Sequence, residues 1–188
     1  TGVMQANQVI EIFNQSLGAR YGVALIGGGD EPFYRARQDT TPAVIVFRAD
    51  FSASALHEVA HWCLAGRRRR QLDDYGYWYL PARNAPQQAA FEAVEARPQA
   101  LESLFAEAAG VDFQVSTDDV AQLPSEPFKA KVASERCLMR QRLPLRATCF
   151  LDALVDANPG KGPPLSRSVP AQPELNDKAN QQKQEHWA

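Results

Sequence analysis

The chain has 188 residues, of which 45% are hydrophobic and 22% charged, with a formal net charge of −2. This composition is typical of one globular domain with its own core, and the weak net charge excludes a general electrostatic attraction to nucleic acid. No stretch approaches the roughly 18–20 apolar residues of a membrane span, and the first residues lack a charged segment followed by an apolar one, so we expect no secretion signal. The three cysteines are odd in number and widely spaced, which fits a reducing compartment, so we expect a cytoplasmic protein.

Hydrophobic spacing predicts the elements of the N-terminal third. Apolar residues recur at near-helical spacing over residues 4–17, which predicts a helix that ends at Gly18. Residues 21–26 predict a short strand, followed by a flexible glycine turn at residues 27–29. No Gly-Lys-Ser/Thr follows this triplet, which disfavours a phosphate loop. The β-branched run of residues 43–47 predicts a buried strand.

The strongest chemical signal is the HExxH motif of residues 57–61. Residues four apart on a helix lie on one face, so His57 and His61 could hold a single metal ion. Glu58 is close enough to serve metal-bound water as a base or proton relay. The alternative is a pair of surface histidines on a polar helix.

The flanks of the motif favour the metal site. They are apolar nearly all round, which predicts a buried helix, and buried histidines need a partner. Ser52 or Ser54 can cap the start of this helix, and Gly66 is suited to its end.

Arginines and aromatics follow the motif. Cations at Arg67–Arg70 suit a helix C-terminus, and the alternative function is a docking patch for an acidic partner. Residues 72–80 predict a strand or extended loop that ends before Pro81. Its aromatics, Tyr77 among them, could line a pocket on one side, or could simply fill the core and the edge.

The rest of the domain is predicted to be helical. Residues 87–96 form one expected helix, and Pro98 begins another that Gly110 caps. Residues 126–157 predict two further helices, broken at Pro144.

These elements predict an α+β fold with a small sheet packed against several helices. We expect residues 1–158 to form a single metal-dependent catalytic domain. Residues 159–188 are rich in proline and polar residues, which predicts a poorly ordered tail.

A tight metal site needs a third protein ligand. Glu92 and Glu95 share one face of a predicted helix, and the apolar residues that follow Glu95 favour its packing toward the motif. Glu92 would then orient a histidine from one turn away. Asp73 and Asp74 are weaker candidates, because they lie beside a predicted turn.

Several segments together resemble one family. They are residues 30–32, the strand 44–47, the motif helix 55–66, the aromatic run 75–79 and residues 91–102. In combination they resemble the bacterial elongation factor P hydroxylase family, over about residues 7–155 of this chain.

The resemblance implies a non-haem iron hydroxylase that uses molecular oxygen. Its substrate would be elongation factor P carrying a β-lysyl group on a lysine. His57, His61 and Glu95 would hold Fe(II), although the same ligands also accept zinc. No 2-oxoglutarate signature is found in the sequence.

The remaining candidate residues would contact the protein substrate. Acidic Glu58, Glu92 or Asp74 could pair with the lysyl ammonium groups, and Tyr77 could cover them. Arg67 could meet an acidic surface of elongation factor P. We expect neither nucleic acid nor a membrane as a partner.

Two other classes remain open. The motif with a downstream glutamate is also the ligand set of zinc metallopeptidases, in which Glu58 would activate water. A metal-stabilised binding module would instead close its site with four protein ligands.

Overall fold

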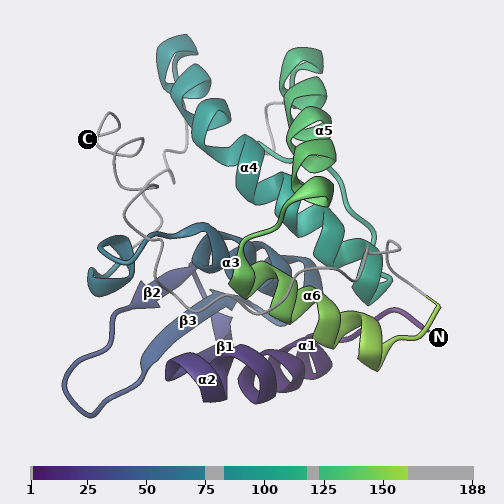
Figure 1. Cartoon of the computed structure of the whole chain (residues 1–188). Helices are drawn as coiled ribbons and strands as arrows, with labels where there is room; N and C mark the ends of the chain where they lie inside the picture. Colours follow the sequence, from purple (N-terminus) through teal and green to yellow (C-terminus); the bar gives the residue numbers. More distant parts are fainter. Residues whose placement is uncertain (1, 75–82, 118–122, 161–188) are drawn as a thin grey trace.

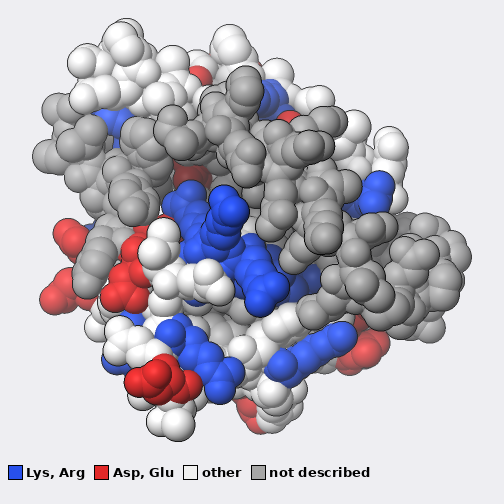
Figure 2. All heavy atoms as spheres, turned by 60° about the vertical axis from the view of Figure 1, so that its left-hand side comes forward, with Lys and Arg blue, Asp and Glu red and all other residues white. Residues whose placement is uncertain are grey.

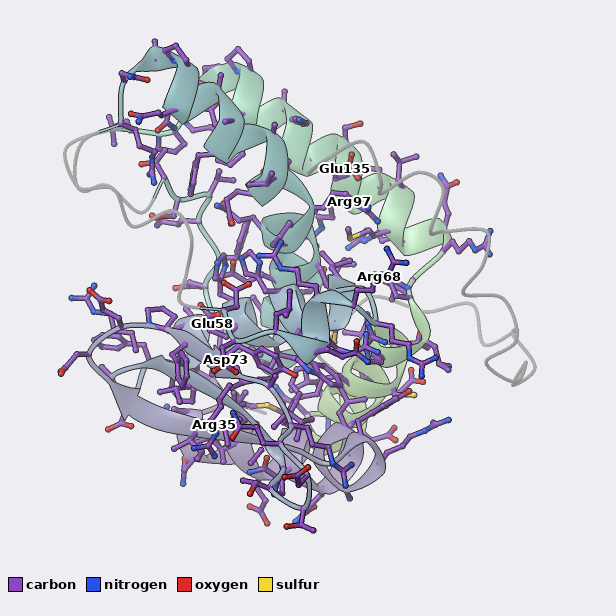
Figure 3. All side chains as sticks on the ribbon, turned by 90° about the vertical axis from the view of Figure 1, so that its left-hand side faces the viewer. Arg35, Glu58, Arg68, Asp73, Arg97 and Glu135 are labelled. Atoms are coloured by element: carbon purple, nitrogen blue, oxygen red, sulfur yellow. The ribbon has the colours of Figure 1, made fainter. Side chains whose placement is uncertain are left out.

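The computed structural model describes residues 2–74, 83–117 and 123–160, and their fold is α+β, as the sequence predicts (Figure 1). A three-stranded sheet lies at one end of the molecule, where α3 contacts β3. At the other end, α4 and α5 rise away from the sheet side by side. Arg97 of α4 and Glu135 of α5 join this pair at 3.8 Å (Figure 3).

The N-terminal helix runs further than predicted. Its three consecutive segments are α1 (Ala6–Phe13), the π-helical η1 (Asn14–Gly18) and α2 (Ala19–Tyr21). The predicted stop at Gly18 is wrong, because the left-handed residue that ends the helix is Gly22, with φ 65°. Gly18 instead allows a close approach, since a Cβ there would lie 2.7 Å from the Val23 carbonyl oxygen.

The sheet consists of β1 (Val23–Gly29), β2 (Phe33–Arg35) and β3 (Ala43–Arg48), in the order β1-β3-β2. β3 pairs in parallel with β1 and antiparallel with β2. The buried strand predicted at residues 43–47 is therefore confirmed. The strand predicted at 21–26 begins two residues late, because Tyr21 still belongs to α2.

The glycine triplet lies inside β1, so the predicted flexible turn is wrong. A Cβ on Gly27 would lie 2.8 Å from the Phe47 ring, and one on Gly29 would lie 2.7 Å from Val46. Gly28 has φ 86°, where the register of the strand shifts. Gly27 and Gly29 let β1 pack closely on β3, and Gly28 supplies the positive φ at the register shift, so no anion is needed to explain the triplet.

The motif helix is α3 (Ser52–Leu64), and six of its residues are buried. The helix begins at the predicted Ser52, but the predicted serine cap is wrong. Ser52 donates its hydroxyl to the Met4 carbonyl, and Ser54 accepts from the Arg48 amide, so the cap position falls to Phe51 without a side-chain bond. The helix ends at Leu64 with Ala65 as its extended C-cap, so Gly66 occupies the predicted C′ position, although its backbone is not left-handed.

Two arginines stabilise the carboxyl end of α3. Arg70 and Arg146 donate to the Ala65 carbonyl oxygen at 2.6 and 2.7 Å. Positive charge is favourable at this end of a helix dipole. Arg70 thus takes the structural role that the arginine run suggested, and it lies within the short 3₁₀ turn η2 (Arg69–Gln71).

The predicted break at Pro98 is wrong, because a single helix, α4 (Ala85–Ala109), runs through it. Proline removes one backbone hydrogen bond from a helix. Burial of this helix on both sides of Pro98 offsets that cost. Gly110 caps α4 in the left-handed conformation, as predicted.

The two C-terminal helices are confirmed. They are α5 (Glu126–Gln141) and α6 (Leu145–Ala157), and Pro144 is the N-cap of the second. The tail from residue 161 and the aromatic run from residue 75 lie outside the described residues. No described helix is both long enough and apolar enough to cross a bilayer.

Edge-to-face aromatic contacts fix the helices that carry the site. Phe13 of α1 meets Trp62 of α3 at 5.8 Å and Phe150 of α6 at 5.7 Å between ring centroids. Phe150 in turn meets Phe105 of α4 at 5.0 Å. Such pairs contribute about 0.5–1.5 kcal/mol beyond burial, so α3 and α4 are held through one shared core.

Candidate metal centre

His57 and His61 of α3 face Glu95 of α4. One ligand atom from each lies within 4.8 Å of the other two. The two histidine Nε2 atoms are 3.0 Å apart, and Glu95 approaches His61 at 3.2 Å and His57 at 3.7 Å. One ion with bonds of about 2.0–2.2 Å could reach all three groups.

A second glutamate of α4 orients His57. The Glu102 carboxylate lies 2.7 Å from His57 Nδ1. A carboxylate accepts hydrogen bonds and does not donate them, so the contact places the hydrogen of a neutral ring on Nδ1. The lone pair then lies on Nε2, on the side of the cluster. Metal-binding histidines are commonly oriented by carboxylates in this way.

The spacing along α4 explains this arrangement. Glu95, Gln99 and Glu102 follow one another at intervals of four and three residues, so they share a face. Gln99 is buried and bonds both the amide and the carbonyl of Ser116, which fixes the middle of that face. Glu102 was not among the predicted site residues, although its seven-residue separation from Glu95 places both on one helix face.

The electrostatics of the cluster couple its three members. Burial lowers the pKa of His57, but the carboxylates of Glu102, Glu95 and Glu58 together more than offset this, and the pKa is raised well above its usual value. Burial likewise opposes charge on His61, and Glu95 raises its pKa. Burial raises the pKa of Glu95, yet the two histidines lower it to about 2.

These residues suit a metal ion. Glu95 is 4% exposed, and its Oε2 is buried without a hydrogen-bond partner. An ion would satisfy this oxygen and both Nε2 lone pairs, whereas two facing imidazoles can share only one hydrogen. The His61 side chain is 36% exposed, so the cluster is accessible on that side within the described residues. Three ligands with an accessible side are typical of a catalytic site.

Comparisons with known proteins support an enzyme of one family. The family model described as elongation factor P hydroxylase matches residues 12–162. Elongation factor P lysine hydroxylase of Haemophilus influenzae is 43% identical over 152 residues, which cover 78% of this chain and 85% of that protein. The chain belongs to the elongation factor P hydroxylase family.

In this hydroxylase family member, the other acidic candidates lie outside the cluster. Glu92 accepts a hydrogen bond from Gln88 at 3.1 Å, and no contact with either histidine is found for it among the described residues. Asp74 pairs with Arg69 at 2.7 Å. Asp73 accepts from the Ala36 amide at 2.7 Å.

Three further candidates were predicted from the sequence, namely Glu58, Arg67 and Tyr77. Glu58 is partly buried on α3, and its charge helps to raise the pKa of both histidines. In the view of Figure 3, Glu58, Asp73 and Arg35 follow one another down the same side of the molecule. Arg67 is exposed just beyond α3, and Tyr77 lies outside the described residues.

Proposed function

We propose that this protein hydroxylates the β-lysylated lysine of elongation factor P with a non-haem iron ion. The proposal is carried by one combination: membership of the family, and a cluster of two histidines and one carboxylate with an accessible side. Two-histidine, one-carboxylate sets with open positions are typical of non-haem Fe(II) oxygenases.

His57, His61 and Glu95 would hold the ion. When bound, Fe(II) supplies the binding and reduction of molecular oxygen, with electrons from an external donor. Glu102 keeps Nε2 of His57 directed at the ion through its bond to Nδ1. The carboxylates therefore have separate tasks, because one binds and the other orients.

Glu58 is the proposed proton carrier of the site. It lies on the same helix as both ligands, and its charge acts on both of them. A carboxylate here also attracts the ammonium groups of a lysylated side chain, so the target carbon can approach without the amine ligating the ion. Asp74, Glu92 and Tyr77 remain candidate contacts for that side chain, and Arg67 for the surface of elongation factor P.

The test is the intact mass of lysylated elongation factor P after incubation with the protein, oxygen, a reductant and either Fe(II) or Zn(II). We expect a gain of one oxygen atom with iron only. Glu95→Ala should lose both the metal and the reaction, while Glu92→Ala should keep the metal. An unchanged mass with iron, together with zinc-dependent cleavage of polypeptides, would favour the metallopeptidase alternative.

A further inference from the structure

A basic pocket of about 180 Å³ lies where β1 and β3 begin and α3 ends. Its walls include Arg37, Arg67 and Arg70, together with the rings of Tyr21, Tyr34 and Trp62. None of its lining residues is acidic, within the part of the chain that the structure describes. Lys and Arg side chains gather in the middle of the face that Figure 2 brings forward.

The aromatic wall of this pocket is held in place. The guanidinium groups of Arg70 and Arg146 lie 5.8 and 5.2 Å from the centre of the Trp62 ring. Tyr21 meets the same ring edge to face at 5.6 Å. Tyr34 donates its hydroxyl to the Arg70 carbonyl at 2.9 Å. A ligand would therefore meet preformed walls, which reduces the entropy lost on binding.

Two of the three arginines, Arg37 and Arg67, carry charges that are available to pair with a ligand. Arg70 is committed to the last carbonyls of α3, where it offsets the negative end of the helix. For Arg37 and Arg67, no ion pair is found among the described residues. The nearby carboxylates have other contacts, since Asp73 accepts from an amide and Asp74 pairs with Arg69.

We propose that this pocket receives one acidic side chain of the protein substrate, at a point separate from the reacting lysine. Small-molecule sites usually measure about 300–1,000 Å³, so this smaller volume favours a single side chain over a nucleotide. Guanidinium groups bind carboxylates through paired, charge-assisted hydrogen bonds. Trp62 directly follows the candidate ligand His61, so the docking point and the metal centre share α3. This inference rests on the proposed function.

The experiment measures hydroxylation kinetics with lysylated elongation factor P at varied concentration. Arg37→Glu, Arg67→Glu and their double variant are compared with Arg48→Glu. Arg48 is an exposed control at the opposite end of β3. We expect the double variant to raise KM at least tenfold while kcat, metal content and thermal midpoint stay unchanged. The difference from wild type should shrink in high salt, which screens exposed charges.

Other results would overturn the docking role. One is an unchanged KM in the metal-loaded double variant, and another is an equal rise in Arg48→Glu. Inorganic phosphate is tested as an alternative ligand. The pocket takes a free oxyanion if phosphate raises the thermal midpoint of the wild type but not that of the double variant, while the variants leave KM unchanged. If the wild type does not hydroxylate at all, the proposed function fails, and direct binding of lysylated elongation factor P still tests the pocket.

Discussion

Replacing Glu102 tests whether the carboxylate behind His57 tunes the metal centre. The Glu102 carboxylate lies 2.7 Å from His57 Nδ1, and the Glu102 side chain is only 12% exposed. The hydrogen bond between the two groups is therefore charge-assisted and shielded from water. Removing such an orienting partner typically weakens metal binding by about 10–100-fold, or about 1.4–2.7 kcal/mol. We expect Glu102→Ala to weaken metal binding by about 100-fold, at the upper end of this range. Glu102→Gln should weaken it by only about 10-fold, because the glutamine amide oxygen still accepts a hydrogen bond, although without the charge.

The assay is competition for Zn(II) with a chromophoric chelator, repeated anaerobically with Fe(II). It is best performed at alkaline pH. Glu102 also raises the pKa of His57, so at low pH its removal would relieve proton competition and mask part of the loss. Glu92→Gln is the matched control one turn before Glu95, and it should bind metal as the wild type does. Affinity within twofold of wild type for Glu102→Ala would refute the orienting role, as would an equal loss in Glu92→Gln.

Three further outcomes follow from the same structure. Metal at a hundredfold excess over Kd should stabilise the protein by about 2.7 kcal/mol, or about 5–11 °C in Tm, and chelator or Glu95→Ala should remove the gain. In the metal-free protein, the pKa values of His57 and His61 are raised from 6.5. The two histidines therefore add their full contribution to the free energy of unfolding below pH 6.5, and this contribution is lost as the pH rises through the raised pKa values. Glu95 has its pKa lowered from 4.5 to about 2, so its contribution is present above 4.5 and is lost toward pH 2. The urea midpoint should therefore be highest between about pH 4.5 and 6.5, where the two histidines and Glu95 all contribute. A urea midpoint that rises steadily from about pH 6 to 9 would contradict this expectation. Phe150→Ala should cost about 3–5 kcal/mol in urea unfolding, because that ring joins two others in the core. The exposed Phe51→Ala should stay within about 0.5 kcal/mol.

The sequence predicted the elements whose signals are local. The β-branched run at 43–47 and the helix break at Pro144 needed only neighbouring residues, and both were right. The stops at Gly18 and Pro98 were wrong because tertiary packing overrides a local preference. At Gly18 a strand passes too close for a side chain, and at Pro98 the helix is buried on both sides of the break.

The candidate site divides in the same way. The spacing of His57 and His61 placed them on one face, and the structure also brings Glu95 to them. The orienting role expected for Glu92 belongs by geometry to Glu102. Both glutamates suit a helix face, and the way α4 packs against α3 decides which one meets a histidine. This packing depends on long-range contacts, which spacing along the chain does not encode.

The candidate metal centre is assembled from two helices that are separate in the sequence. His57 and His61 belong to α3, whereas Glu95 and Glu102 belong to α4. A gene divided between these helices would yield two fragments, each carrying half of the coordination sphere. Neither fragment would carry all three candidate ligands, so recovered metal binding would report their reassembly. The bound ion would hold the two fragments together, so this enzyme could be divided to make a metal-dependent split reporter.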